Sequence, residues 1–251
     1  MNAVLKRILA SGVVKDEQGK DCPLSANIAP REGELLQRFI LELRPKVSVE
    51  IGLGFGVSTL YICDALAEVG GHKHIVCDPD QFEGFRGIGW KNICEAGYEH
   101  LVELHPVSSH VLLPQLEQQG LRIGFAFIDG WHTFDYVMID FFYVDRLLLP
   151  GGIVVFDDVA YPAVRKLCRY ITTNRTYEVA GGDNRPASGQ RRIAEWAARF
   201  AGLSRFCHPS LICADSRLGI NASYVALRKT SDDVLGSGQN RTRRWDQHTD
   251  F

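Results

Sequence analysis

Five carboxylates in this sequence end, or directly follow, short apolar runs: Glu50, Asp78, Asp129, Asp157 and Asp158. Asp129 and the Asp157-Asp158 pair follow two successive runs, which would be neighbouring strands of a sheet and would place three carboxylates within a few ångströms of one another. Two unscreened like charges about 4 Å apart cost roughly 4 kcal/mol at an effective dielectric constant near 20. Such a cluster therefore requires a cation, a basic side chain or a raised pKa.

Carboxylate oxygens favour hard divalent cations such as Mg²⁺, Ca²⁺ or Mn²⁺. The sequence therefore predicts a metal site at Asp129, Asp157 and Asp158. An ordinary hydrogen-bonded cluster is the alternative, in which some of the acids cap the helices that follow them.

A histidine, His132, lies three residues after Asp129. Because imidazole titrates near neutral pH, His132 is a candidate general base. It could also bind the metal or hydrogen-bond at the start of the next helix, and the residues alone leave these three roles open. Trp131, beside it, is expected to form an apolar wall of the site or to pack in the core.

Three glycines, Gly52, Gly54 and Gly56, follow the apolar run 47–51, and Val57-Ser58 then opens a helical pattern. Glycine lets the backbone pass close under a ligand, and the helix N-terminus then faces that ligand. The dinucleotide fingerprint is spaced G-x-G-x-x-G. The spacing here is G-x-G-x-G with Glu50 ahead of it, which suits a ligand that carries positive charge, although a simple tight turn is the alternative.

Asp78 lies about one βαβ half-unit after the glycines, where a carboxylate can accept both hydroxyls of a ribose. It indicates a nucleoside-containing ligand and does not separate nicotinamide cofactors from others.

Alternating strand and helix patterns must position these residues. The expected strands are 47–51, 74–77, 101–104, 123–128 and 152–156, and the expected helices are 58–69, 85–96, 110–119, 133–149 and 163–172. Such alternation predicts right-handed βαβ units and an α/β fold with a doubly wound, mostly parallel sheet. In open sheets of this kind, ligands bind beyond the carboxyl ends of the strands, where these acids lie.

The pattern changes after residue 172. We expect a short strand at 177–180, a polar loop at 181–189, a helix at 191–202 and a final antiparallel strand at 222–228, at the sheet's end. The domain prediction is one domain over 1–229, with a helical lead-in at 1–45 and a substrate cover at 181–221, followed by a polar tail at 230–251.

The composition fits a soluble globular protein. The chain has 251 residues, of which 45% are hydrophobic and 23% charged, and its formal net charge of −2 gives no reason to expect nucleic acid or an anionic membrane as partner. Lys6 and Arg7 interrupt the first apolar run, so a signal peptide or membrane span is not expected there. Seven scattered cysteines without a C-x-x-C pair favour reduced thiols and a cytoplasmic location.

Together these residues resemble the class I S-adenosylmethionine-dependent methyltransferases. The stretch 50–56 resembles the first motif of that family, and Cys77-Asp78-Pro79 resembles the second. The stretches 127–137, 149–152 and 156–158 are similar to the small-molecule O-methyltransferase branch, which includes antibiotic-tailoring and catechol-type enzymes. The resemblance implies a seven-stranded, Rossmann-like fold with an antiparallel last strand.

The resemblance also implies roles for the candidate residues. S-adenosyl-L-methionine would be the cofactor, with its methionine part above Gly52, Gly54 and Gly56 and its ammonium near Glu50. Asp78 would hold the ribose hydroxyls, and Ser108 or Ser109 would lie near the adenine. The remaining expected cofactor contacts are Ser58 and Asp129.

For catalysis, the resemblance implies that Asp129, Asp157 and Asp158 hold Mg²⁺. The metal would bind an oxygen of a small-molecule substrate and lower its pKa. His132 would remove the proton, so His132 and Asp129 are the expected catalytic residues. The oxygen would then attack the sulfonium methyl group in line.

Two departures and two alternatives accompany this hypothesis. Residues 105–110 lack the acidic signature usual near the adenine, and residues 181–221 match no known pattern. A catalytically silent S-adenosylmethionine-binding protein is one alternative. An NAD(P)-dependent oxidoreductase is the other, although the glycine spacing and the lack of a Tyr-x-x-x-Lys pair oppose it. By analogy with the fold, a homodimer is expected.

Overall fold

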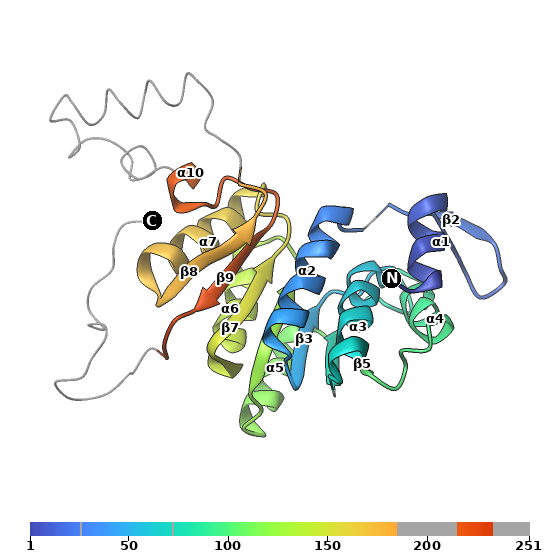
Figure 1. Ribbon diagram of the computed structural model, residues 1–251, viewed down its shortest axis with the longest axis horizontal. Coiled ribbons are helices and arrows are strands. Elements are labelled where there is room, and N and C mark those ends of the chain that lie inside the picture. The colour runs from blue at the N-terminus through green and yellow to red at the C-terminus, as the bar shows by residue number, and fades with distance from the viewer. Residues whose placement is uncertain (26, 72, 185–214, 233–251) are drawn as a thin grey trace, which may run out of the picture.

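The computed structural model describes residues 1–25, 27–71, 73–184 and 215–232 (Figure 1). Its main sheet has seven strands in the order β5-β4-β3-β6-β7-β9-β8. These are β3 Val47–Ile51, β4 Lys73–Cys77, β5 Val102–His105, β6 Ile123–Ile128, β7 Leu148–Phe156, β8 Tyr177–Gly182 and β9 Val225–Lys229. Strands β3 to β7 pair in parallel, and β9 is antiparallel to both of its neighbours. The predicted mostly parallel α/β sheet with an antiparallel last strand is confirmed.

The predicted position of that last strand was wrong. Strand β9 lies between β7 and β8, where it pairs Arg228 with Ile153 and Lys229 with Tyr177, so β8 is the edge strand. The physical reason is burial: Val225, Ala226 and Leu227 are fully buried, as expected of a strand covered on both faces, whereas β8 is largely exposed.

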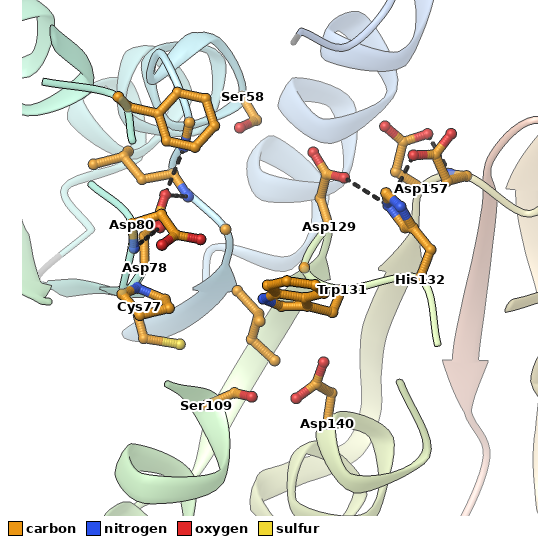
Figure 2. Close-up of a pocket in the computed structure, with 18 of the residues that line it drawn as sticks. Ser58, Cys77, Asp78, Asp80, Ser109, Asp129, Trp131, His132, Asp140 and Asp157 are labelled. Carbon is orange, nitrogen blue, oxygen red and sulfur yellow. Dashed lines mark hydrogen bonds and ion pairs between the residues drawn. The ribbon is translucent and has the colours of Figure 1, made fainter. Parts of the chain in front are cut away.

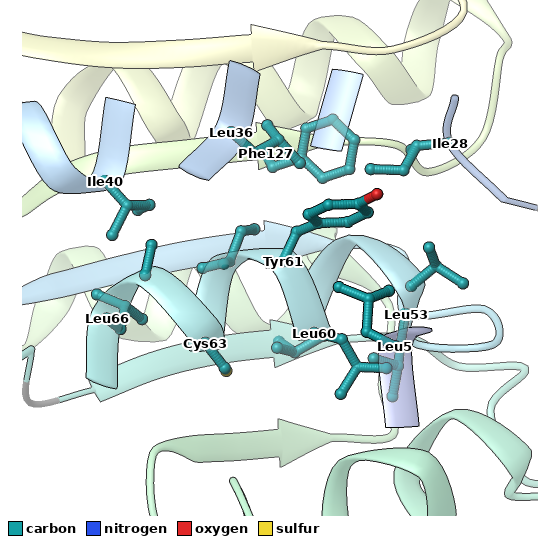
Figure 3. Close-up of a cluster of buried hydrophobic side chains, with 14 of the residues drawn as sticks. Leu5, Ile28, Leu36, Ile40, Leu53, Leu60, Tyr61, Cys63, Leu66 and Phe127 are labelled. Atoms are coloured by element: carbon teal, nitrogen blue, oxygen red, sulfur yellow. The ribbon is translucent and has the colours of Figure 1, made fainter. Parts of the chain in front are cut away.

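Helices cover both faces of the sheet. The described helices are α1 Ala3–Ser11, α2 Pro30–Leu43, α3 Val57–Val69, α4 Ile88–Glu95, α5 Ser109–Gln118, α6 Phe134–Leu147, α7 Pro162–Asn174 and α10 Asp215–Leu218. Helices α1 to α4 pack on one face of the sheet, where Phe125 and Phe127 of β6 point. Figure 3 shows part of this cluster around Tyr61 of α3. Helices α5, α6 and α7 pack on the other face, where Ala126 and Ile128 point.

The N-terminal segment contains more than the predicted helical lead-in. A two-stranded antiparallel hairpin, β1 Val13–Lys15 and β2 Asp21–Pro23, lies between α1 and α2. Its turn is closed by Asp16, whose carboxylate accepts the backbone N–H groups of Gln18 and Lys20 at 3.1 and 2.8 Å. The connection from this hairpin into α2 runs past the open end of the sheet and forms one wall of the cavity described below.

The helix predicted at 191–202, most of the expected cover and nearly all of the polar tail lie outside the described residues. The division into domain, cover and tail therefore stays a prediction. None of the helices that the structure describes has the length and apolar character of a membrane span.

Candidate active site

A cavity of about 590 Å³ opens at the carboxyl ends of β3, β4, β6 and β7 (Figure 2). The strand register explains why the predicted residues meet there. Ile51 pairs with Cys77 and with Ile128, and Ile128 pairs with Phe156, so the residue after each strand lies at the same edge of the sheet. The predicted site residues that line this cavity are Gly52, Gly54, Ser58, Asp78, Ser109, Asp129, His132, Asp157 and Asp158. Ser108 and Trp131 line it as well.

Gly52 is the point at which the glycine turn touches the next strand. Its φ is +93°, and a Cβ there would overlap the backbone carbonyl oxygen of Asp129. A hydrogen bond also joins the two segments, since the Asp129 N–H donates to the Ile51 carbonyl at 2.9 Å. The Gly52 N–H donates to the Cys77 carbonyl at the end of β4, at 2.9 Å. Glycine is therefore required here by both conformation and space.

Asp78 holds the glycine turn in place. One of its carboxylate oxygens accepts the N–H groups of Leu53 and Gly54 at 3.0 and 2.9 Å, and the other accepts the N–H of Asp80 at 2.9 Å. The side chain is nearly buried and faces the cavity. Because a carboxylate can accept about four hydrogen bonds, Asp78 can fix the turn and still bind ligand hydroxyls.

Glu50 does not line the cavity, and its expected position near the ammonium of the cofactor stays a prediction. Its fully buried carboxylate accepts the hydroxyls of Ser58 and Thr59, the latter at 2.7 Å, and lies 2.7 Å from His74 Nε2. The other ring nitrogen of His74 lies 2.9 Å from the Ser48 hydroxyl. All of these partners are internal, so Glu50 anchors the first turn of α3 beneath the glycines.

Gly56 also lies outside the cavity lining, although it was expected beneath the cofactor. It is the N-cap of α3, with a φ of +80°. A Cβ at this position would lie 3.0 Å from the carbonyl oxygen of Gly89. Gly56 therefore allows α4 to pack closely against the start of α3.

The opposite end of the cavity is acidic, and we call Asp129, His132, Asp157 and Asp158 the acidic end. His132 Nε2 lies 2.9 Å from Asp158 Oδ2 and 4.0 Å from Asp129 Oδ1. The ring of Tyr161 stacks on His132, with centroids 4.9 Å apart and planes 2° from parallel. Figure 2 shows His132 between the carboxylates of the two strand ends.

Burial and like charge change the protonation equilibria at the acidic end. Burial is the main cause that raises the pKa of Asp129 to about 6, and burial together with the charge of Asp129 raises the pKa of Asp157 to about 7. The nearby carboxylates of Asp129 and Asp158 raise the pKa of His132 to about 10. Without another cation, His132 therefore holds a proton between the carboxylates.

The possible metal ligands that lie closest together include His132 in place of the predicted Asp157. Atoms of Asp129, His132 and Asp158 lie within 4.8 Å of one another, the spacing that a metal ion could bridge. Asp157 faces the same cavity, but its Oδ1 accepts the N–H of Asp158 at 2.6 Å. Asp158 itself has a φ of +54°, a rare conformation for a residue with a side chain.

Two buried carboxylates near the cavity were not predicted, Glu32 of α2 and Asp140 of α6. Glu32 is 2% exposed, and its Oε1 has no hydrogen-bond partner in the described part of the chain. Burial, and then the charges of Asp157 and Asp129, raise its pKa to about 10. A sequence signal existed, because Glu32 lies on the apolar stripe of α2, at i−3 and i−4 from Leu35 and Leu36.

Comparison with known proteins finds relatives of the segment that carries this site. A family model described as a methyltransferase domain matches residues 49–159, the segment that contains the glycine turn, Asp78 and the acidic end. The transmembrane O-methyltransferase of Propithecus coquereli is 28% identical over 158 residues, which are 62% of this chain and 56% of the relative. Catechol O-methyltransferase of Bos taurus is 22% identical over 188 residues, 70% of this chain and 67% of the relative.

Solved structures agree in fold. The O-methyltransferase from Bacillus cereus in complex with SAH superposes with a TM-score of 0.58 at 20% identity, over 72% of this chain and 83% of that one. The chain spans little more than half the length of the transmembrane O-methyltransferases that it matches. The comparisons confirm the fold and the resemblance to the class I S-adenosylmethionine-dependent methyltransferases.

Proposed function

We propose that this chain, which carries a methyltransferase domain of the class I S-adenosylmethionine-dependent family, moves a methyl group from S-adenosyl-L-methionine to a hydroxyl oxygen of a small molecule. One observation supports the proposal: a single cavity is lined by Gly52, Gly54 and Asp78 at one end and by the acidic end at the other. The reacting oxygen and the methyl donor would therefore meet in the same cavity.

The cofactor would lie along the glycine turn. Gly52 and Gly54 leave the backbone open to the methionine part, Asp78 would accept the ribose hydroxyls, and Ser109 would lie at the adenine. Ser58 and Asp129 complete the proposed contacts. The carboxylates around the cavity also suit a ligand whose reactive sulfur is a cation.

The acidic end fits a divalent cation. Three oxygen and nitrogen ligand atoms already converge there, and burial close to like charges raises the pKa values of Asp129 and Asp157, which a bound cation would oppose. Asp129 and Asp158 would hold Mg²⁺, together with Asp157 or His132. When bound, the cation would bind the acceptor oxygen and lower its pKa. It would also neutralise the carboxylates that raise the pKa of His132.

His132 would take the proton of the acceptor hydroxyl. Tyr161 stacks on its ring, and the Asp158 carboxylate lies 2.9 Å from Nε2. To act as a base, His132 must first give up the proton that Asp129 and Asp158 hold on it. The acceptor oxygen then forms its bond to the methyl carbon as the carbon–sulfur bond breaks, and that electron pair stays on sulfur.

The oxidoreductase alternative is disfavoured by the glycine turn itself. A dinucleotide pyrophosphate would need backbone N–H groups of the turn. Here the N–H groups of Leu53 and Gly54 already donate to Asp78, and that carboxylate would repel a pyrophosphate. The silent-binder alternative is disfavoured because the acidic end and His132 face the cavity.

Calorimetric titration of the purified chain with S-adenosylmethionine, and with NAD⁺ as control, tests the cofactor with and without MgCl₂. We expect S-adenosylmethionine to bind and NAD⁺ not to bind. Transfer of a labelled methyl group to catechol, used as a probe acceptor, then tests catalysis; His132→Gln should keep cofactor binding and lose transfer. Binding of NAD⁺ instead would overturn the proposal, and binding without transfer to any hydroxylated probe would favour a silent binder. A cytoplasmic location, a homodimer and the absence of nucleic-acid or membrane partners stay predictions.

A further inference from the structure

Asp140 is a buried carboxylate that the mechanism above does not use. It lies in the middle of α6, is 1% exposed and lines the same cavity as Asp78 and Ser109. Its Oδ1 has no hydrogen-bond partner in the part of the chain that the structure describes. Figure 2 shows Asp140 and Ser109 facing the same space on one side of Trp131, with Asp129 on the other side.

An ionisable group in this position is costly for a purely structural role. Burial raises the pKa of Asp140 to about 6, and the hydrogen bond from Ser109 opposes that rise only in part. Burying a carboxylate with one oxygen unpaired costs free energy that an apolar residue would not cost. The neighbouring buried residues of α6, Val137, Phe141 and Val144, are apolar. The other buried carboxylate of this helix, Asp145, is paired with Arg175 and Tyr177.

The surroundings of Asp140 connect it to the ribose end of the cavity. Cys77, the residue before Asp78, and Asp140 both line the cavity. Burial, followed by the charge of Asp140, raises the pKa of the Cys77 thiol. Gly130 lies beside Asp140, and even an added Cβ there would be 3.6 Å from Asp140 Oδ2. Without a side chain at Gly130, the space in front of the carboxylate stays open.

The chemistry of this position selects one kind of group. An ionised carboxylate only accepts hydrogen bonds, so its partner must donate. A nucleoside whose ribose is held at Asp78 would direct its base towards Ser109 and Asp140. Adenine has an exocyclic amine with two N–H donors, whereas a 6-keto purine has an acceptor oxygen at that position, which the carboxylate would repel.

We propose that Asp140 is a cofactor-binding residue that accepts a hydrogen bond from the exocyclic amine of adenine and thereby selects adenine over 6-keto purines. This inference rests on the proposed function and adds a specificity determinant to it.

The test compares two ligands that differ only at this position, S-adenosylhomocysteine and its deaminated analogue S-inosylhomocysteine, by calorimetric titration of the whole chain. We expect the wild type to bind the adenine compound at least about tenfold more tightly, since hydrogen bonds to charged groups are the stronger ones. Asp140→Asn should reduce this preference to about twofold or less, because a carboxamide can present either an acceptor or a donor. Asp80→Asn, at the exposed rim, is the matched control and should leave the preference unchanged.

The ratio of the two affinities separates a binding role from a structural one. A structural defect in Asp140→Asn would weaken both ligands alike and leave their ratio intact, which would overturn the inference. A wild type without preference would overturn it even if the variant failed to fold, and Asp140→Ser offers a second variant. If the wild type binds neither ligand, the proposed function itself fails, whereas tight binding of both ligands alike contradicts only the role of Asp140.

Discussion

At the glycine-turn end of the cavity, Asp78 is satisfied by the protein itself, with three backbone N–H groups on its two oxygens. At the acidic end, Asp129 and Asp157 have raised pKa values because they are buried close to like charges. His132 is the only basic side chain that the structure describes between those carboxylates, and it is held in place by their charge. An ionised aspartate is thus stabilised by hydrogen bonds at one end of the cavity, whereas its ionisation is disfavoured by burial and like charge at the other end.

The two ends of the cavity therefore differ in how far they are preorganised for a ligand. The turn end is formed by hydrogen bonds that need no ligand, so its shape should be the same in the free and bound chain. The acidic end is incomplete without added positive charge, so its stability should depend on pH and on cations.

The largest effect is expected from Gly52→Ala, because Gly52 joins the two ends. A Cβ there would overlap the Asp129 carbonyl, and the φ of +93° disfavours any side chain. Overpacking and backbone strain together should lower the free energy of unfolding by about 3–5 kcal/mol. Urea denaturation measures this loss, and calorimetry should show that S-adenosylmethionine binding and any Mg²⁺ effect disappear together.

Gly54→Ala is the control for that variant. Gly54 has a φ of +51°, but an added Cβ would meet only the Phe85 ring, at 3.7 Å. The cost should be limited to the left-handed conformation, about 1–2 kcal/mol. Equal losses in the two alanine variants would show that the contact with Asp129 does not link the ends.

Glu32 extends the acidic end into α2 and should make stability depend on pH. Its pKa is about 10 in the folded chain against 4.5 for the free side chain, so the folded state keeps a proton that the unfolded state loses. The stability that Glu32 provides is therefore complete below about pH 4.5 and is lost as the pH rises towards 10. Glu32→Gln removes this loss, and at pH 8 it should raise the free energy of unfolding by up to about 4 kcal/mol.

Urea denaturation at pH 5, 7 and 9 in EDTA measures the effect of Glu32→Gln, which should grow with pH. Glu34→Gln, on the exposed side of the same helix, should show no such trend. If both variants have the same free energy of unfolding as the wild type at every pH, ionisation of Glu32 does not lower stability, and Glu32 does not belong to the acidic end.

The sequence was a good guide to the edge of the sheet on which the site lies. Strand positions are encoded locally by apolar runs, and parallel pairing then places the residue after each strand at one edge. This is why Asp78, Asp129 and Asp157 were predicted together and found together. What the sequence could not show was the order of the strands, because β9 enters the sheet between β7 and β8 through contacts distant in sequence.

Side-chain direction limited the prediction of the site. Val49 and Ile51 point to one face of β3, so Glu50 points to the other, beneath α3, where the hydroxyls of Ser58 and Thr59 receive it. That alternation was readable in sequence. The roles of Glu32 and Asp140 were less accessible, because an acid on an apolar helical stripe is visible but the cavity that it faces depends on tertiary packing.

Asp78→Asn tests whether the glycine turn depends on the hydrogen bonds that the Asp78 carboxylate accepts. An asparagine keeps the shape but turns an amide donor towards a backbone N–H that needs an acceptor. The free energy of unfolding should fall by about 1–3 kcal/mol. S-adenosylmethionine affinity should fall at least about tenfold, in this variant and in Asp78→Ala. Asp80→Asn is the control, and unchanged affinity in the Asp78 variants would remove Asp78 from the binding site.

The same substitution at the acidic end, Asp157→Asn, should have the opposite sign. Asparagine can still accept the Asp158 N–H, so the hydrogen bond is kept while the charge is lost. The pKa of Asp157 is raised from 3.8 to about 7, so its ionisation costs stability as the pH rises between these values. In EDTA at pH 8, the variant should be more stable than the wild type by about 1 kcal/mol.

Adding MgCl₂ should reverse that order, because a cation stabilises only a chain that keeps its carboxylates. Replacing Asp157 and Asp158 together with Asn should abolish the rise in melting temperature on addition of Mg²⁺. A persistent rise would move the ion elsewhere in the chain. If Asp157→Asn and Asp78→Asn instead destabilise the metal-free chain equally, both ends of the cavity are satisfied without a ligand, and the contrast between them does not hold.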